Sequence, residues 1–186
     1  MSRGNPEKAI AALIPSPLEA VPGVVVRPMT LGMWAALERI KSPLVTGDEP
    51  KDTLEIIPSL YLITHDPREI FSPDFLDAAM KWADTMPVDV VAAIDKAARR
   101  QIDAAVDVIP EDDGKTSKKK NDGWITILVD WTAETYGWSF EQILWEVPLS
   151  AICLLRRQAG VRAGKVFPLQ VIEEIDHGNE KFDSRD

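Results

Sequence analysis

The residues whose side chains could do chemistry are few and lie far apart. The chain has two histidines, His65 and His177, and one cysteine, Cys153. Neither histidine has a second His or Cys at the spacing that a metal site needs. His65 stands directly before a predicted helix, which favours a capping or surface role over catalysis. Cys153 lies in an apolar run, which predicts a small buried side chain rather than a reactive thiol.

Other chemistry is equally poorly supported. Neither a dinucleotide-binding glycine fingerprint nor a Walker-type phosphate loop occurs in the sequence. Adjacent acids, Asp112 with Asp113 and Glu173 with Glu174, stand in polar stretches that cannot desolvate a carboxyl and raise its pKa. We therefore expect no catalytic residue, no cofactor and no metal, and a protein that binds other proteins rather than an enzyme.

Aromatic residues are the feature that exceeds a generic helical domain. Four tryptophans follow one another at intervals of seven residues, or about two helical turns, although Gly137 interrupts any single helix through them. Packing in a small helical core is the favoured interpretation, and an exposed stripe is the alternative, because large aromatics dominate interface hot spots. The partner-binding hypothesis names Trp124, Trp131, Trp138, Phe140 and Trp145.

Charge and cysteine content limit the class of protein. The 186 residues carry 21 basic and 30 acidic side chains, a net charge of −9, whereas nucleic-acid binders need a concentrated basic face. A single cysteine permits no intrachain disulfide, which suits a reducing cytoplasm. The sequence shows no signal-peptide pattern and no run near the ~20 apolar residues that span a bilayer. We expect a protein that is neither exported nor inserted, with neither nucleic acid nor membrane as partner.

The predicted fold class is all-α: a small multi-helix domain with a mobile linker, a short C-terminal helical cluster and loosely ordered tails. Residues 1–23 form a proline-rich N-terminal arm, and 24–109 form the helical domain. Residues 110–122 contain no large apolar side chain and are expected to be a flexible linker. Residues 123–160 form a Trp-rich helical segment packing on the helical domain, and 161–186 form an acidic tail. The triplet at 24–26 is β-branched, but no hairpin partner is evident, so we expect no sheet.

Capping residues place the first helices. Thr30 is the predicted N-cap of a helix that ends near Lys41. Asp52 with Glu55 makes a capping-box pattern for a helix that Pro58 should kink or shift. Later starts come from proline at a first helical position: one helix covers 75–83, and the longest opens at 86–87 and should stop by 110.

The C-terminal helices are predicted in the same way. A helix that begins at Trp124 should stop at Gly137, where glycine supplies a left-handed residue. Ser139 with Gln142 caps a short helix over 140–146. A third helix follows Pro148, covers 149–158 and is expected to close at Gly160.

Two blocks of sequence resemble a known family. The first is Arg27-Pro28-Met29-Thr30-Leu31-Gly32 followed by Ser42-Pro43-Leu44-Val45-Thr46-Gly47, and the second is Tyr136-Gly137-Trp138-Ser139 with Ile143-Leu144 and Pro148-Leu149. In order and spacing, over 27–64 and 123–160, they resemble tail assembly chaperones of long-tailed bacteriophages and prophages.

The resemblance implies a small helical protein in the cytoplasm of the bacterial host. It would bind the tape-measure protein, keep it soluble, help recruit tail-tube subunits, and leave before the virion is mature. The alternative is a permanent virion structural protein, such as a head–tail connector or tail completion protein. Self-association, and an enzyme with an unrecognised site, stay open as further alternatives.

Overall fold

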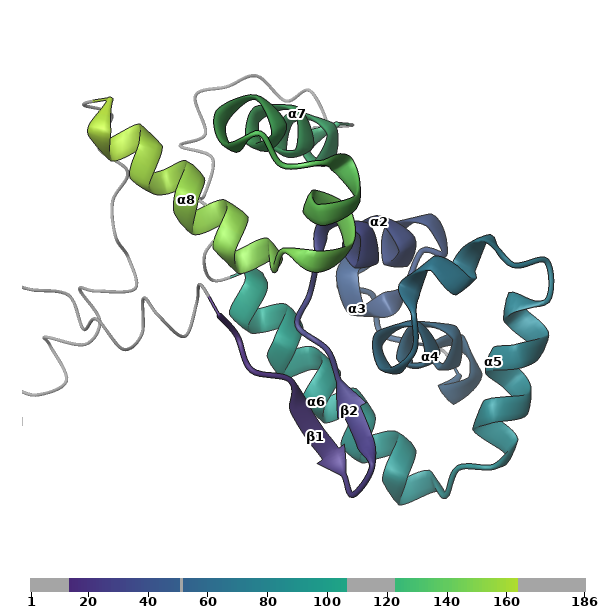
Figure 1. Cartoon of the computed structure of the whole chain (residues 1–186). Helices are drawn as coiled ribbons and strands as arrows, with labels where there is room; N and C mark the ends of the chain where they lie inside the picture. Colours follow the sequence, from purple (N-terminus) through teal and green to yellow (C-terminus); the bar gives the residue numbers. More distant parts are fainter. Residues whose placement is uncertain (1–13, 51, 107–122, 164–186) are drawn as a thin grey trace, which may run out of the picture.

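The computed structural model describes residues 14–50, 52–106 and 123–163, which form a mostly helical fold with one small hairpin (Figure 1). The elements in chain order are β1 (Leu18–Val21), β2 (Val24–Val26), α2 (Leu31–Arg39), α3 (Pro43–Thr46), η1 (Thr53–Glu55), α4 (Ile57–Thr64), η2 (Pro67–Phe71), α5 (Phe75–Asp84), α6 (Val88–Val106), α7 (Trp124–Tyr136), η3 (Gln142–Glu146) and α8 (Leu149–Arg162). The expected all-α class is confirmed, with the hairpin as an addition. Among the described residues, no helix is both long and apolar enough to cross a bilayer.

The hairpin shows that the expectation of no sheet was wrong. Strand β1 pairs antiparallel with β2, with Leu18 opposite Val26, and Gly23 takes the left-handed φ of +83° in the turn. Both strands pack on α6, where the Gln101 amide also donates to the Ser16 carbonyl at 2.9 Å. Part of the predicted arm is therefore a strand. A two-stranded hairpin is marginal alone, and here the long helix beside it supplies the missing support (Figure 1).

Of the predicted starts of the first two helices, that at Thr30 is confirmed and that at Asp52 is wrong. The Thr30 hydroxyl accepts from the Met33 amide at 3.2 Å at the beginning of α2. The Asp52 carboxylate accepts from the Leu54 amide, but only the short 3₁₀ helix η1 follows it. Helix α4 begins at Ile57, because Pro58 fits only in a first turn, so the proline shifts the start.

Helices α5 and α6 lie where they were predicted, but Pro73 and Pro87 precede them and do not occupy a first helical position. Helix α5 begins at Phe75, after Ser72 and Pro73, and α6 begins after Pro87 and is described through Val106. The predicted stop near Pro110 and the predicted linker at 110–122 lie outside the described residues. So do residues 1–13 of the predicted arm and residues 164–186 of the predicted tail. Helix α6 packs against both strands, α4 and α8, and so forms the central support of the fold (Figure 1).

Two features of the C-terminal part differ from the prediction. Helix α7 ends at Gly137 with φ +68°, as predicted. The predicted short helix is instead mainly a π-helix, η3, in which the Val147 amide donates to the Gln142 carbonyl at 2.9 Å. Gly160 does not end the last helix, since α8 continues to Arg162. An interior glycine costs a helix only about 1 kcal/mol, which neighbouring turns can offset.

One buried core joins the N- and C-terminal parts. Side chains of α2, α4 and α6 share it with Leu128 of α7, Ile143 of η3, and Leu149 and Ile152 of α8. Every one of these four C-terminal side chains is at most 4% exposed. The segment from Gly123 onward is therefore built into the same fold as the helices before residue 107.

Candidate protein-binding surface

The two ends of the tryptophan series hold the C-terminal segment on α2. Trp124, at the start of α7, meets Trp34 edge-to-face with ring centroids 5.7 Å apart. Trp145, in η3, lies against Gly32 so closely that a Cβ at Gly32 would be 2.5 Å from two of its ring atoms. Both side chains are half-buried. Trp124 and Trp145 therefore have structural roles in joining α7 and η3 to α2.

The middle two tryptophans form a cluster with a tyrosine at the surface. Tyr136 meets Trp131 edge-to-face at 5.7 Å and stacks on Trp138 at 5.2 Å. Tyr136 is 37% exposed, and Trp131 and Trp138 are half-buried. Ile127, one turn before Trp131 on the same side of α7, is 53% exposed. We call Ile127, Trp131, Tyr136 and Trp138 the aromatic face.

Phe140 is the most exposed of the five predicted binding residues, at 63%. It follows Trp138 by two residues, after the break at Gly137. The structure thus places Trp131 and Trp138 in one cluster and leaves Phe140 at the surface, close to them in the chain. Trp124 and Trp145 instead pack against α2. Ile127 and Tyr136 were not predicted as binding residues. The available signals were the position of Tyr136 at the end of a helix, before Gly137, and the i, i+4 spacing of Ile127 to Trp131.

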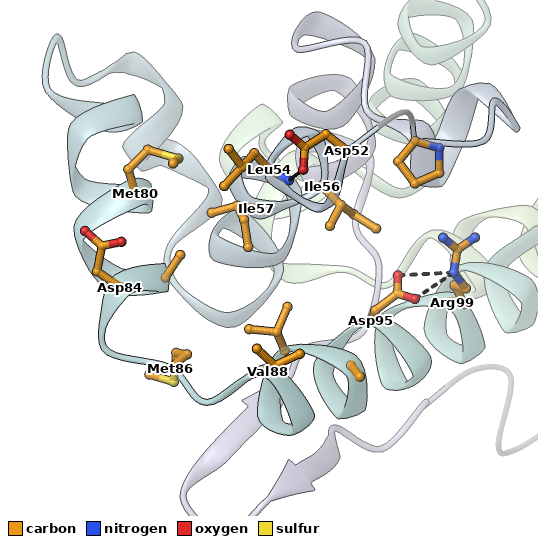
Figure 2. Close-up of a pocket in the computed structure, with 14 residues that line it drawn as sticks. Asp52, Leu54, Ile56, Ile57, Met80, Asp84, Met86, Val88, Asp95 and Arg99 are labelled. Atoms are coloured by element: carbon orange, nitrogen blue, oxygen red, sulfur yellow. Dashed lines mark hydrogen bonds and ion pairs between the residues drawn. The ribbon is translucent and has the colours of Figure 1, made fainter.

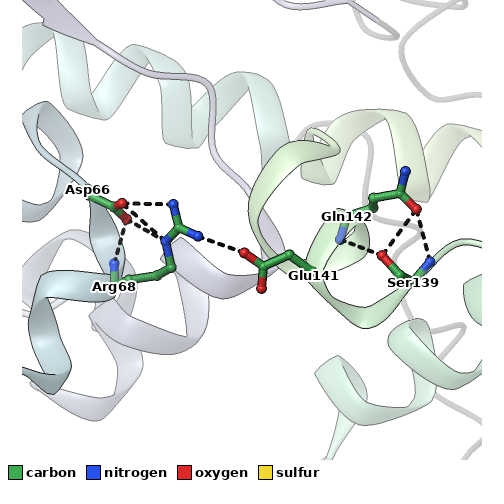
Figure 3. Close-up of polar contacts among 5 residues, drawn as sticks. All are labelled: Asp66, Arg68, Ser139, Glu141 and Gln142. Carbon is green, nitrogen blue, oxygen red and sulfur yellow. Dashed lines mark hydrogen bonds and ion pairs between the residues drawn. The ribbon is translucent and has the colours of Figure 1, made fainter.

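The turn that carries the aromatic face is held by hydrogen bonds (Figure 3). Ser139 and Gln142 form the predicted capping box. The backbone amide of Gln142 donates to the Ser139 hydroxyl at 3.2 Å, and the backbone amide of Ser139 donates to the side-chain oxygen of Gln142 at 3.0 Å. The Arg68 guanidinium of η2 donates to the Glu141 carboxylate at 2.6 Å. These contacts fix the start of η3 relative to η2 and to the end of α7.

The Arg68 guanidinium also holds Asp66 through a forked contact (Figure 3). Hydrogen bonds from Arg68 are the main cause that lowers the pKa of the Asp66 carboxyl below its ordinary value. The same pair raises the pKa of Arg68. All three side chains are well exposed, so the network orients a loop more than it stabilises the fold.

The segment of chain that carries the aromatic face is acidic. Between residues 123 and 155 the sequence has four acids and no lysine or arginine. The acids, Asp130, Glu134, Glu141 and Glu146, are all exposed. A surface with rings and carboxylates is suited to a partner with apolar and basic side chains.

The chemically reactive residues have structural surroundings. His65 is the C-cap of α4 and stacks on Tyr61 at 4.1 Å. Tyr61 donates to the Glu69 carboxylate, which is the main cause that raises the tyrosine pKa to about 12. Cys153 is 2% exposed, and burial raises the pKa of its thiol to about 11. Within the described ranges, no three His, Cys, Asp or Glu side chains gather as metal ligands would. His177 and the acid pairs at 112–113 and 173–174 lie outside those ranges.

The two sequence blocks that carry the family resemblance meet in space. The Leu149 amide donates to the Met29 carbonyl at 2.8 Å, and Thr30 forms a bridge with Pro148. Beside this bridge, Trp145 covers Gly32. The starts of α2 and α8 are therefore joined, and η3 packs beside this junction through Trp145.

Comparison of the chain with models of protein families, with characterised proteins and with solved structures gives no significant match.

Proposed function

We propose that this chain is a tail assembly chaperone of a long-tailed bacteriophage or prophage. It binds the tape-measure protein, keeps it soluble, and helps recruit tail-tube subunits during tail morphogenesis. The observation that carries the proposal is the aromatic face: Trp131, Tyr136 and Trp138 contact one another at the surface, on an acidic segment of the chain.

The physical chemistry of a tape-measure client supports this choice. A long helical chain with apolar seams needs those seams covered until tube subunits arrive. Rigid aromatic side chains supply large contact areas with little loss of conformational entropy. Negative charge keeps copies of the chaperone apart before they meet a client. Helix α7 carries residues of both kinds, with Trp131 and Tyr136 for contact and the exposed acids Asp130 and Glu134 for charge.

The contact between the two sequence blocks also supports the proposal. Motifs that are about a hundred residues apart meet through the Met29–Leu149 hydrogen bond and the Gly32–Trp145 contact. The resemblance therefore involves one continuous part of the fold, and that part supports the aromatic face.

Two phenylalanines of similar exposure allow a matched test of the binding surface. Phe140 is 63% exposed and adjoins the aromatic face in the chain, whereas Phe71 is 67% exposed at the end of η2. We expect Phe140→Ala to weaken binding of a purified tape-measure segment about tenfold, and Phe71→Ala to leave it unchanged. Calorimetric titration of the client segment measures both, and equal losses from the two variants would contradict the assignment.

Trp138 is the expected anchor of the same surface. Trp138→Ala should weaken client binding by about 2 kcal/mol, which is roughly thirtyfold in Kd. Because Trp138 also packs against the core, urea unfolding of the variant is measured alongside. Loss of folding in place of binding would assign the side chain to the core alone.

The chaperone is proposed to act in the cytoplasm of the bacterial host and to leave before the virion is complete. Quantitative mass spectrometry of purified particles tests this part. Absence of the chain from finished particles agrees with a chaperone. Stoichiometric retention would replace the proposal by a permanent virion protein, such as a head–tail connector or tail completion protein.

A further inference from the structure

A second candidate surface is separate from the aromatic face. A groove of about 740 Å³ opens between α5, α6 and the segment that contains η1 and the start of α4 (Figure 2). Apolar side chains from all three elements line it. It shares no lining residue with the aromatic face, so it requires its own explanation.

The groove exposes apolar side chains to an unusual degree. Leu54 of η1 is 54% exposed, Met80 of α5 is 36% exposed, and Val88 at the start of α6 is 84% exposed. Leu76, one turn before Met80 on α5, does not line the groove but is also 58% exposed. Met80 and Met86 both line the groove, and methionine adapts readily to the shape of a partner.

The charged residues of the groove define the partner's charge. Three aspartates line it, Asp52, Asp84 and Asp95, against one arginine, Arg99. Arg99 already pairs with Asp95 at 3.1 Å. Figure 2 shows Asp84 at one end of the opening and the Asp95–Arg99 pair at the other. The carboxylates of Asp52 and Asp84 therefore leave a negative rim around an apolar floor.

From these observations we propose that the groove binds an amphipathic helix of another protein, with apolar side chains at i, i+3 or i+4 and i+7, flanked by lysine or arginine. A helix laid along a groove buries its apolar stripe and keeps its polar side in water. A small apolar ligand fits less well, since such ligands are enclosed on most sides, whereas Val88 is 84% exposed. The inference is independent of the proposed function.

The charge pattern also argues against the chain's own C-terminal segment as the occupant. Residues 164–186 carry six acidic and three basic side chains, and their excess of carboxylates would face the negative rim. Two copies of the chain, each with a net charge of −9, repel one another for the same reason. A basic partner helix is the occupant that the rim favours.

The methionines provide a direct test with the full chain. The sequence has five, of which Met80 and Met86 line the groove while Met29 and Met33 are buried elsewhere. The protein is labelled with ¹³C-methyl methionine and followed by NMR. A leucine–lysine amphipathic peptide about five turns long should shift the methyl signals of Met80 and Met86 and leave those of Met29 and Met33 unchanged. A leucine–glutamate peptide with the same apolar spacing should bind at least about tenfold more weakly, and salt should reduce the difference.

Substitutions separate the groove from other surfaces. Val88→Lys should weaken binding of the leucine–lysine peptide about tenfold, and it should fold, because Val88 is 84% exposed. Phe71→Lys makes the same charge change outside the groove and should have no effect.

Three results would overturn the proposal. Peptide shifts confined to the indole signals of Trp131 and Trp138 would move the site to the aromatic face. Changes of the Met80 signal with protein concentration alone would assign the groove to a second copy. Changes of that signal on deletion of 1–13 or 164–186, without peptide, would assign it to the chain itself.

Discussion

Gly32→Ala tests the closest contact in the fold. Gly32 is buried within α2, where a Cβ would stand 2.5 Å from two ring atoms of Trp145 and 2.7 Å from the carbonyl oxygen of Leu144. Gly32 is the second residue of α2, and replacing a helical glycine by alanine, with free space beside it, stabilises a protein by up to about 1 kcal/mol. Overpacking of a closed contact costs about 1–3 kcal/mol. The ring can turn aside, but the carbonyl moves only if η3 moves, so the clash should exceed the gain.

We therefore expect Gly32→Ala to lower the free energy of unfolding by about 1–2 kcal/mol. Equilibrium unfolding in urea, followed by far-UV circular dichroism, gives the value independently of tryptophan fluorescence. In a Trp145→Ala background the cost should fall by about 1 kcal/mol, because the two sites are in contact. An increase in stability of about 1 kcal/mol, as for a helical glycine with free space beside it, would refute the packing of η3 on α2.

Three further predictions concern caps, charges and the thiol. Thr30→Ala should cost about 1 kcal/mol of stability, measured by urea unfolding, because the hydroxyl caps α2. Arg68→Ala should lower stability only slightly, and less at high salt, because its contacts with Asp66 and Glu141 are exposed and screened by solvent. Arg68 lowers the pKa of the Asp66 carboxyl in the folded state. The stabilisation from this pair is therefore present above about pH 4 and is lost as the pH falls through the lowered pKa of Asp66. Acid unfolding of the wild type and of Arg68→Ala measures the difference. Cys153 should resist iodoacetamide until urea unfolds the chain, and stability should fall as the pH rises from its ordinary pKa of 9.0 towards about 11, because burial raises the pKa of the folded thiol.

Local signals predicted most of the helices. Thr30, Ser139 and Gly137 act within a few residues of themselves, so their capping roles can be read from the sequence. The hairpin could not be predicted in this way, because its stability depends on α6, which begins more than sixty residues later. The π-helix η3 also lacked a local signal, since its packing against Gly32 is set by a distant part of the chain.

The candidate site was predictable by residue type but not by exposure. Four tryptophans at equal spacing look equivalent in the sequence. Contacts with α2 distinguish them: Trp124 packs on Trp34, and Trp145 packs on Gly32. Trp131 and Trp138 contact Tyr136 at the surface instead. The groove was missed for a related reason: its apolar residues fit the periodic pattern of core helices, and only the tertiary structure leaves them exposed.

Co-expression with the longest predicted-helical protein of the same phage or prophage tests the central proposal most directly. Affinity purification and the soluble fraction of that protein are measured with and without the chain. We predict that the client co-purifies and that its solubility depends on the chain, with both effects reduced by Phe140→Ala and retained by Phe71→Ala. A client that is soluble alone and does not bind would contradict the account.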